Sequence, residues 1–229
     1  MMKYLTTVLI ALVAGFAGAA AFTYSGLGDA KTREYLVSNP DILPEMAAAY
    51  QTQESRQQLA SIEDSVSQPF EGAVLGNPDG STTLVKFTDY ACGYCRSTVA
   101  DIDRLIAADP DLRVVVREWP IFNGSEAPAR MGLAAAKQGK YDAFYHALFE
   151  LGTPSEENVI AAARIAGLDL AAAQEYSMSD EVTAELVRND GFARQLGFGG
   201  TPSWVIGDQV FEGAVGYDRL AQYVEDAEG

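Results

Sequence analysis

The stretch T-T-L-V-K-F-T-D-Y-A-C-G-Y-C-R-S, residues 82–97, decides the fold. Its first seven residues are rich in β-branched side chains and predict a strand from Thr82 to Thr88. This strand leads into Cys92-Gly93-Tyr94-Cys95, and the helical spacing of the apolar residues that follow predicts a helix over 96–107. The Cys92 sulfur then lies at the helix N-terminus and the Cys95 sulfur one turn deeper on nearly the same face, so the two sulfurs can bond.

The position of Cys92 favours a reactive thiolate. Unsatisfied amides and the positive end of the helix dipole lower a thiol pKa from about 8.5 into a range of roughly 3.5 to 7.5. Cys95 is more enclosed, and we expect it to be the resolving thiol that attacks a mixed disulfide on Cys92 and releases the partner. Tyr94 lies between the cysteines at the helix start, so we expect its side chain to be exposed.

The rest of the chain surrounds this unit with further elements. A strand over 112–119 completes a strand–helix–strand unit, and its continuous apolar run is typical of a buried parallel strand. A short strand at 73–75 and the turn Asn77-Pro78-Asp79-Gly80 predict a hairpin, or a pair of adjacent strands, with the strand that precedes the cysteines. The remaining predictions are a helix to Ser38, a helix over 41–66, four or five helices within 124–197, strands at 203–206 and 210–212, and a helix over 217–227.

A second motif, F-G-G-T-P-S-W-V-I-G at residues 198–207, places a glycine-flanked proline before a strand. Together with the cysteine pair and the long helical block, it resembles the DsbA-like thioredoxin family over about residues 70–227. The resemblance implies an α/β thioredoxin fold with an inserted helical domain and an N-terminal helical arm. It also implies that Pro202 is cis against the cysteines and that the Thr201 backbone pairs with an extended substrate. A trans proline that opens an edge strand is the alternative.

Within that family the chain is similar to the branch of suppressor-of-copper-sensitivity proteins and related exported disulfide isomerases. The similarity lies in residues 89–95, D-Y-A-C-G-Y-C, and in Tyr35-Leu36 and Asn39-Pro40 of the helical region before them. Some members of the branch use such an arm to form oligomers. The resemblance therefore implies a homo-oligomer through residues 29–68, while an arm docked on its own domain is the other interpretation.

One position departs from the family pattern. Six residues before the first cysteine the family usually has an acid beneath the active site, and here the residue is Lys86. Lys86 stabilises a thiolate if it is charged and near the cysteines, but it can also point to solvent. Asp89 or Glu118 is then the candidate that supplies the acid. All three residues are candidates for tuning the thiol pKa values.

The first residues read as a targeting segment. Lys3 precedes an apolar run over 5–22 that ends in small residues, which is typical of a secretory signal, whereas an uncleaved membrane anchor over 5–22 is the alternative. Either interpretation places the chain outside the cytoplasm, in the periplasm or an equivalent compartment. We thus expect a signal peptide or anchor over 1–21, a helical arm over 22–68, and the thioredoxin domain over 69–229 with its insertion at about 124–197.

Composition excludes several classes of function. The 229 residues suit one large domain, and the formal charge of −16 repels nucleic acid and anionic lipid. A structural zinc site needs four ligands, but the chain offers two cysteines and the single histidine His146, which we expect on the surface or in the core of a helix. Covalent haem attachment needs a histidine after the second cysteine, where Arg96 stands. No cofactor is expected.

The sequence therefore predicts an exported thiol–disulfide oxidoreductase that acts on cysteines of other exported polypeptides and is recharged by a membrane redox partner. Whether it works as an oxidase, an isomerase or a reductase stays open. A Cu(I)-handling protein that uses the two thiolates, and an oligomeric chaperone or scaffold, are the rival interpretations. Several aromatic residues either line a shallow groove for unfolded polypeptide or, in most cases, belong to the core: Tyr90, Tyr94, Trp119, Phe122, Phe198 and Trp204.

Overall fold

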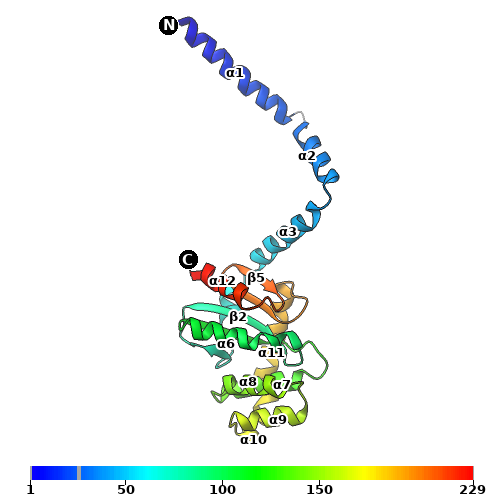
Figure 1. Ribbon diagram of the computed structural model, residues 1–229, viewed down its shortest axis with the longest axis vertical. Helices are drawn as coiled ribbons and strands as arrows, with labels where there is room; N and C mark the ends of the chain where they lie inside the picture. The colour runs from blue at the N-terminus through cyan, green and yellow to red at the C-terminus, as the bar shows by residue number, and fades with distance from the viewer. Residues whose placement is uncertain (1, 25–26, 229) are drawn as a thin grey trace. The chain divides into compact units, whose positions relative to one another are not determined.

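The computed structural model describes residues 2–24 and 27–228 and divides into two compact units, Met1–Thr52 and Gln53–Gly229 (Figure 1). Residues 1, 25, 26 and 229, which belong to the expected leader, arm and C-terminal end, lie outside the described residues.

The first unit is helical. It contains α1 (Met2–Tyr24), α2 (Leu27–Ser38) and most of α3 (Ile42–Leu59). Among the described residues no helix is both long and apolar enough to cross a membrane. Large apolar side chains are exposed along α2 and α3: Tyr35, Val37, Leu43, Met46 and Tyr50.

The second unit begins with the C-terminal end of α3. The expected single helix over 41–66 is wrong, because the chain turns after Leu59 and resumes as α4 (Glu63–Ser67). The turn lets the Leu59 and Val66 side chains pack into one apolar cluster with Val85 and Val115 of the sheet. Leu59 and Val66 therefore belong to the core of this unit.

The second unit is built on a five-stranded sheet with the order β1-β3-β2-β4-β5. The strands β2 and β3 are parallel and the other pairs are antiparallel. The expected hairpin and the expected pair of adjacent strands are both wrong, because β1 pairs with β3 rather than β2. The Asn77 amide donates to the Leu112 carbonyl and the Asn77 side chain donates to the Pro110 carbonyl, so the turn is fixed to the start of β3. The strands are β1 (Val74–Gly76), β2 (Thr82–Thr88), β3 (Leu112–Glu118), β4 (Ser203–Ile206) and β5 (Gln209–Glu212).

Alternate residues of the central strands serve two faces, as the two-residue period of a strand requires. Leu84, Val114 and Trp204 lie in the cluster that packs with α6 (Val99–Ala108) and α12 (Tyr217–Glu228), while Val85 and Val115 lie in the cluster with α4. The expected helix over 96–107 is divided in two, since α5 (Gly93–Ser97) ends at Thr98. The Thr98 hydroxyl donates to the Cys95 carbonyl at 2.8 Å at this break.

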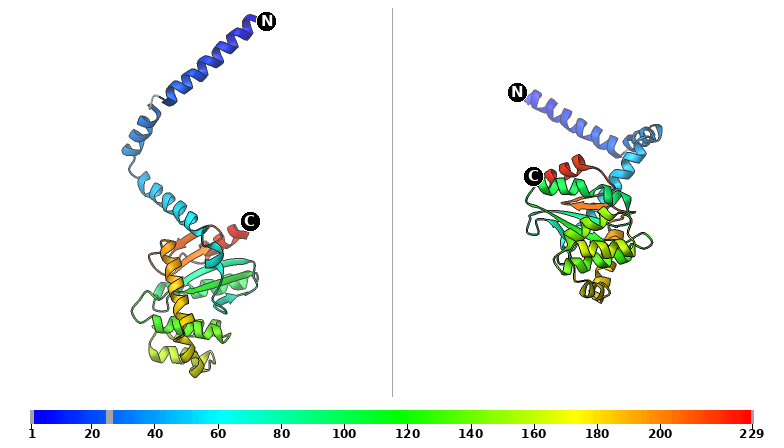
Figure 2. Two further views of the ribbon diagram at one scale, coloured as in Figure 1. Left: turned by 180° about the vertical axis from the view of Figure 1, so that it is seen from behind. Right: turned by 60° about the horizontal axis from the view of Figure 1, so that its bottom comes forward.

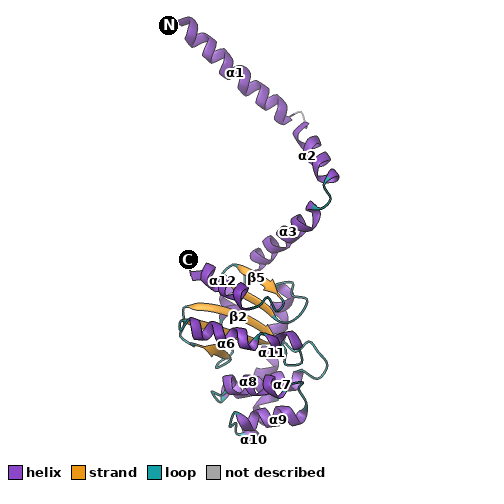
Figure 3. Cartoon of the chain, viewed as in Figure 1, coloured by secondary structure: helices purple, strands orange, loops and turns teal. Residues whose placement is uncertain are grey.

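The helical insertion contains five helices, within the predicted range of 124–197. They lie together beside the sheet, and α11 extends from this block to the sheet (Figures 2 and 3). This arrangement confirms the α/β thioredoxin fold with a helical insertion. The helices are α7 (Glu126–Lys137), α8 (Tyr141–Leu151), α9 (Glu156–Ile165), α10 (Leu170–Ser177) and α11 (Asp180–Gln195).

A buried arginine joins the sheet, α11 and the chain before β1. The Arg117 side chain is fully buried and pairs with Glu185 of α11 at 2.7 Å. The same guanidinium donates to the backbone carbonyls of Ser65, Val66 and Gln68. Because every one of these acceptors is held by one planar group, residues 65–68 are fixed against the sheet.

Candidate active site

The fold brings the two sequence motifs to one end of the sheet. Cys92 follows the C-terminal end of β2, and β4 begins opposite that end because Ser203 pairs with Phe87. The Thr201–Pro202 peptide bond immediately before β4 is cis, as the family resemblance implies, which excludes the trans alternative. The Cys92 thiol donates to the Thr201 carbonyl at 3.1 Å. The motifs therefore form one site.

The Cys92 sulfur is strongly biased toward the thiolate. A hydrogen bond from the Cys95 thiol is the largest cause, and it outweighs burial, which acts in the opposite direction. Thr201 and the backbone N–H groups of Cys95 and Tyr94 act in the same direction as the Cys95 thiol, and together these groups lower the Cys92 pKa to about 5. At neutral pH about a hundred thiolates exist for each thiol, because the difference is about two pH units.

Cys95 is perturbed in the opposite direction. Its side chain has no exposed surface, and burial is the main reason that the Cys95 pKa is raised. The hydrogen bond with Cys92 raises the Cys95 pKa further, because Cys95 must keep its proton to donate it. The pair therefore consists of one sulfur that ionises readily and one that holds its proton.

Lys86 lies beneath the cysteines and is fully buried, so the interpretation in which it points to solvent is wrong. Its ammonium donates to the Tyr145 hydroxyl at 2.6 Å, to the Thr98 hydroxyl at 3.0 Å and to the Cys95 carbonyl at 3.5 Å. The rings of Phe149 and Trp204 lie 5.7 and 5.5 Å from the nitrogen. Burial lowers the Lys86 pKa to about 8.

Glu118 is a second buried ionisable group on the same side of the sheet. Its Oε1 accepts hydrogen bonds from Tyr90 at 2.9 Å and from Tyr141 at 2.7 Å, while burial raises the Glu118 pKa to about 8. Gly132 of α7 leaves room for this carboxyl, since a Cβ at that position would lie 2.8 Å from Oε1. The contact of Tyr145 with Lys86 and that of Gly132 with Glu118 could not be predicted, because the two residues of each pair are far apart in the sequence.

Asp89 has a structural role in the loops around Cys92. Its carboxylate accepts hydrogen bonds from the backbone N–H groups of Ala91, Ile121 and Phe122 and from the Ser125 hydroxyl. These bonds tie the loop before the cysteines to the loop after β3. Both carboxylate oxygens of Asp89 thereby bond to loop groups.

Exposed apolar side chains surround the site. The Tyr94 side chain is 71% exposed, as expected, and Ile121 and Phe122 are also exposed. The other aromatic residues of the expected groove are core residues: Tyr90, Trp119, Phe198 and Trp204. These three exposed side chains therefore offer apolar surface to a polypeptide.

The single histidine, His146, is paired with groups other than the sulfurs. His146 on α8 forms a hydrogen-bonded pair with Asp103 of α6 at 2.8 Å. Within residues 2–24 and 27–228, no cluster of three or more His, Cys, Asp or Glu side chains has the arrangement to hold a metal ion.

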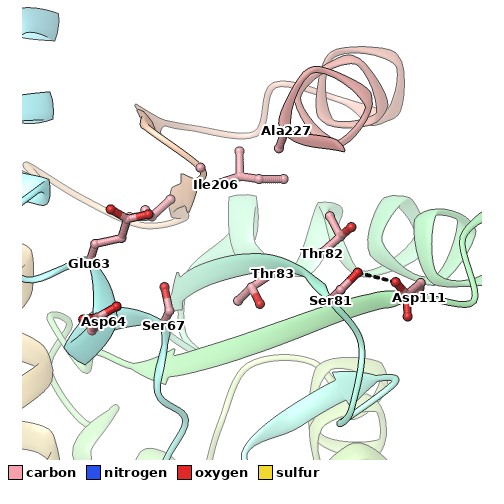
Figure 4. Close-up of a pocket in the computed structure, with 11 residues that line it drawn as sticks. Glu63, Asp64, Ser67, Ser81, Thr82, Thr83, Asp111, Ile206 and Ala227 are labelled. Carbon is pink, nitrogen blue, oxygen red and sulfur yellow. Dashed lines mark hydrogen bonds between the residues drawn. The ribbon is translucent and has the colours of Figure 1, made fainter. Parts of the chain in front are cut away.

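A polar pocket of about 710 Å³ lies at the opposite end of β2 from the cysteines, between α4, β4 and α12 (Figure 4). The acidic residues Glu63, Asp64 and Asp111 line it, and the Ser81 hydroxyl donates to Asp111. The pocket shares no residue with the thiol site.

Comparisons with known proteins agree with this geometry. The DSBA-like thioredoxin domain family matches residues 83–225, which is more than half of the chain. The N-terminal domain of the copper resistance protein ScsC matches residues 30–57. The DsbA-like match thus includes the cysteine and proline motifs, and the ScsC match includes Tyr35-Leu36 and Asn39-Pro40.

Three solved structures are similar. A thioredoxin-like oxidoreductase from Silicibacter pomeroyi DSS-3 has 43% identity and a TM-score of 0.63, over 68% of this chain and 91% of that chain. A linker-deletion variant of Proteus mirabilis ScsC has 27% identity and a TM-score of 0.73, over 87% of this chain and 92% of that chain. The thiol-disulfide exchange protein alpha-DsbA2 from Wolbachia pipientis has 26% identity and a TM-score of 0.69, over 77% of this chain and 97% of that chain.

A curated relative, the Na(+)/H(+) antiporter NhaA of Herminiimonas arsenicoxydans, is 34% identical over 99 residues. The match includes 42% of this chain but 16% of the antiporter, so the activity of that protein is not transferred to this chain. The family match spans the thiol site itself. The chain therefore belongs to the DsbA-like thioredoxin family of protein thiol–disulfide oxidoreductases and isomerases, in its ScsC-type branch.

Proposed function

We propose that this protein exchanges disulfides with exported polypeptides through Cys92, and that Cys95 resolves the resulting mixed disulfide. The opposite pKa perturbations of the two thiols carry the proposal. The Cys92 thiolate attacks one sulfur of a partner disulfide, and the partner's other sulfur leaves. Cys95 then attacks the Cys92 sulfur, the enzyme disulfide forms, and the partner is released reduced. The same steps in reverse oxidise a partner.

The cis-proline loop is the proposed binding site for the substrate backbone. The Thr201 carbonyl accepts a hydrogen bond from the Cys92 thiol. Once Cys92 is a thiolate it has no proton to donate, so this carbonyl becomes available to an amide of an extended chain. The exposed side chains of Tyr94, Ile121 and Phe122 supply apolar contacts beside it. Such contacts suit unfolded polypeptides rather than one folded partner.

Export and assembly belong to the same proposal. The apolar leader directs the chain out of the cytoplasm and into a compartment in which disulfides persist. The exposed apolar residues of α2 and α3 provide a surface through which copies of the arm associate, and association surrounds one client with several thiol sites. A membrane redox partner resets the cysteine pair between turnovers.

The experiment measures both directions of exchange with the exported chain. Oxidation of reduced ribonuclease, refolding of scrambled ribonuclease and reduction of insulin are compared for the native protein, Cys92→Ser and Cys95→Ser. We expect Cys92→Ser to abolish all three activities and Cys95→Ser to accumulate mixed disulfides. Full activity of Cys92→Ser in any assay would contradict the proposal. The reduction potential of the pair then separates an oxidase from an isomerase or reductase.

Assembly is tested separately. Val37→Glu and Leu43→Glu place charges on exposed apolar positions of the arm. We expect both variants to reduce the mass measured by light scattering to that of one chain and to lower isomerase activity more than insulin reduction. A native mass of one chain would refute assembly while leaving the exchange chemistry intact.

A further inference from the structure

The surroundings of Lys86 are unusual for a lysine. The side chain starts on a central strand and ends in the core, with no exposed surface. Its hydrogen-bond acceptors are uncharged oxygens of Thr98, Tyr145 and Cys95. A buried ammonium without a close carboxylate is costly, so such a group favours its neutral amine. A neutral amine in the core is a base.

A base at this point has a chemical task. The Cys95 thiol holds its proton firmly, has no exposed surface, and must lose that proton whenever Cys95 attacks a mixed disulfide on Cys92. Bulk water does not reach a fully buried thiol. The amine contacts the carbonyl of Cys95 itself, and the Lys86 charge lowers the Cys95 pKa.

We propose, building on the exchange function above, that Lys86 is the acid–base group that exchanges a proton with Cys95. The neutral Lys86 amine takes the thiol proton while the Cys95 sulfur donates an electron pair to the Cys92 sulfur. The bond between Cys92 and the partner breaks, and the partner sulfur leaves with that electron pair and takes a proton from solvent. Cys95 is oxidised and the partner is reduced. In the reverse direction the Lys86 ammonium returns the proton to the leaving Cys95 sulfur.

Other ionisable groups face Lys86 from each packed element and set the pH at which it works. Cys92 and Cys95 at the start of α5, Asp103 of α6 and Glu118 of β3 favour the ammonium when they carry a negative charge. Tyr145 of α8 accepts its shortest hydrogen bond. Burial outweighs these charges, so at pH 7 about one Lys86 side chain in ten is the amine that accepts a proton.

Glu118 completes the buried pair. Its raised pKa keeps most of this carboxyl protonated at neutral pH, so it does not cancel the Lys86 charge. The Tyr141 hydroxyl donates to Glu118 and the Tyr145 hydroxyl accepts from Lys86, and the centres of these two rings are 6.0 Å apart. Lys86 and Glu118 thus titrate in the same group of buried tyrosines. Of the two, Lys86 rather than Glu118 contacts the backbone of Cys95.

The test separates attack by Cys92 from resolution by Cys95. Reduced full-length protein is mixed with oxidised glutathione, quenched in acid and weighed intact, so that the mixed disulfide and the enzyme disulfide are counted over time. For Lys86→Met we expect mixed-disulfide formation within about threefold of native, but resolution about 100-fold slower at pH 7, the lower end of general acid–base effects. The native resolution rate should rise with pH and level off above about 8, where Lys86 is already the amine, whereas the Lys86→Met rate should keep rising because it follows the small thiolate share of Cys95.

Two further variants distinguish proton exchange from charge and from packing. Lys86→Arg keeps a charge that does not titrate here, and its resolution rate is also expected to lack the levelling near pH 8. Lys137→Met, which removes a surface lysine, should behave as native. Resolution by folded Lys86→Met at the native rate and pH dependence would overturn the inference, as would a native profile for Lys86→Arg. Absence of any mixed disulfide in the native protein would instead refute the exchange function.

Discussion

The thiolate character of Cys92 depends on its neighbour, and this dependence can be measured. The hydrogen bond from the Cys95 thiol is the largest cause of the low Cys92 pKa of about 5. A hydrogen bond to a charged group contributes about 1.5–3 kcal/mol, and one pKa unit corresponds to about 1.4 kcal/mol. Replacing Cys95 with Ala should therefore raise the Cys92 pKa by about one to two pH units.

The matched variant Cys95→Ser keeps a donor at the same place and should hold the Cys92 pKa near the native value. At pH 6 the thiolate share should be about 90% in Cys95→Ser and between about 10% and 50% in Cys95→Ala. The ultraviolet absorbance of the thiolate against pH reports this share, and the alkylation rate with iodoacetamide provides a second measure. Coincident titration curves for the two variants would refute the reasoning.

Three further predictions concern stability and are checked by thermal or denaturant unfolding. Gly132→Ala places a methyl group against the buried carboxyl beside it and should cost about 1–3 kcal/mol; an unchanged midpoint would contradict the close packing. Glu185→Gln leaves the buried Arg117 guanidinium without its charge partner and should cost about 3–5 kcal/mol, whereas a loss below about 1 kcal/mol would mean that the pair is unimportant. Burial lowers the His146 pKa, but hydrogen bonds to Asp103 and the helix backbone raise it above its usual value. The pair therefore stabilises the fold fully below pH 6.5 and loses this effect as pH rises through the raised pKa, so His146→Gln should lower the melting temperature more at pH 5.5 than at pH 9.

The parts of the site that depend on local pattern could be predicted from the sequence. The strand over Thr82–Thr88 and the start of the helix after Cys92 follow from β-branched composition and helical spacing, and the structure contains both. The cis peptide before Pro202 is implied by the family resemblance of the motif at residues 198–207, and the structure contains it. In each case the signal and the element that it specifies lie within a few residues.

The parts that depend on distant partners could not be predicted. The direction of Lys86 depends on Tyr145 and Trp204, which reach it from other elements of the folded chain. The pairing of β1 depends on a turn that bonds to the start of β3. The bend after Leu59 likewise depends on an apolar surface of the sheet that forms from several strands. None of these choices has a local sequence signature.

The clamp formed by Arg117 determines where the chain can be shortened. The guanidinium binds main-chain oxygens of residues 65–68, so the amino acids there can vary while the path of the chain cannot. A fragment that starts at residue 69 would contain both cysteines but would lack the carbonyls that accept hydrogen bonds from Arg117. Because the guanidinium would then be buried without these acceptors, the fragment should express poorly. A recombinant form for crystallisation or screening should begin before Leu59, so that the segment ahead of the first strand continues to serve as its anchor.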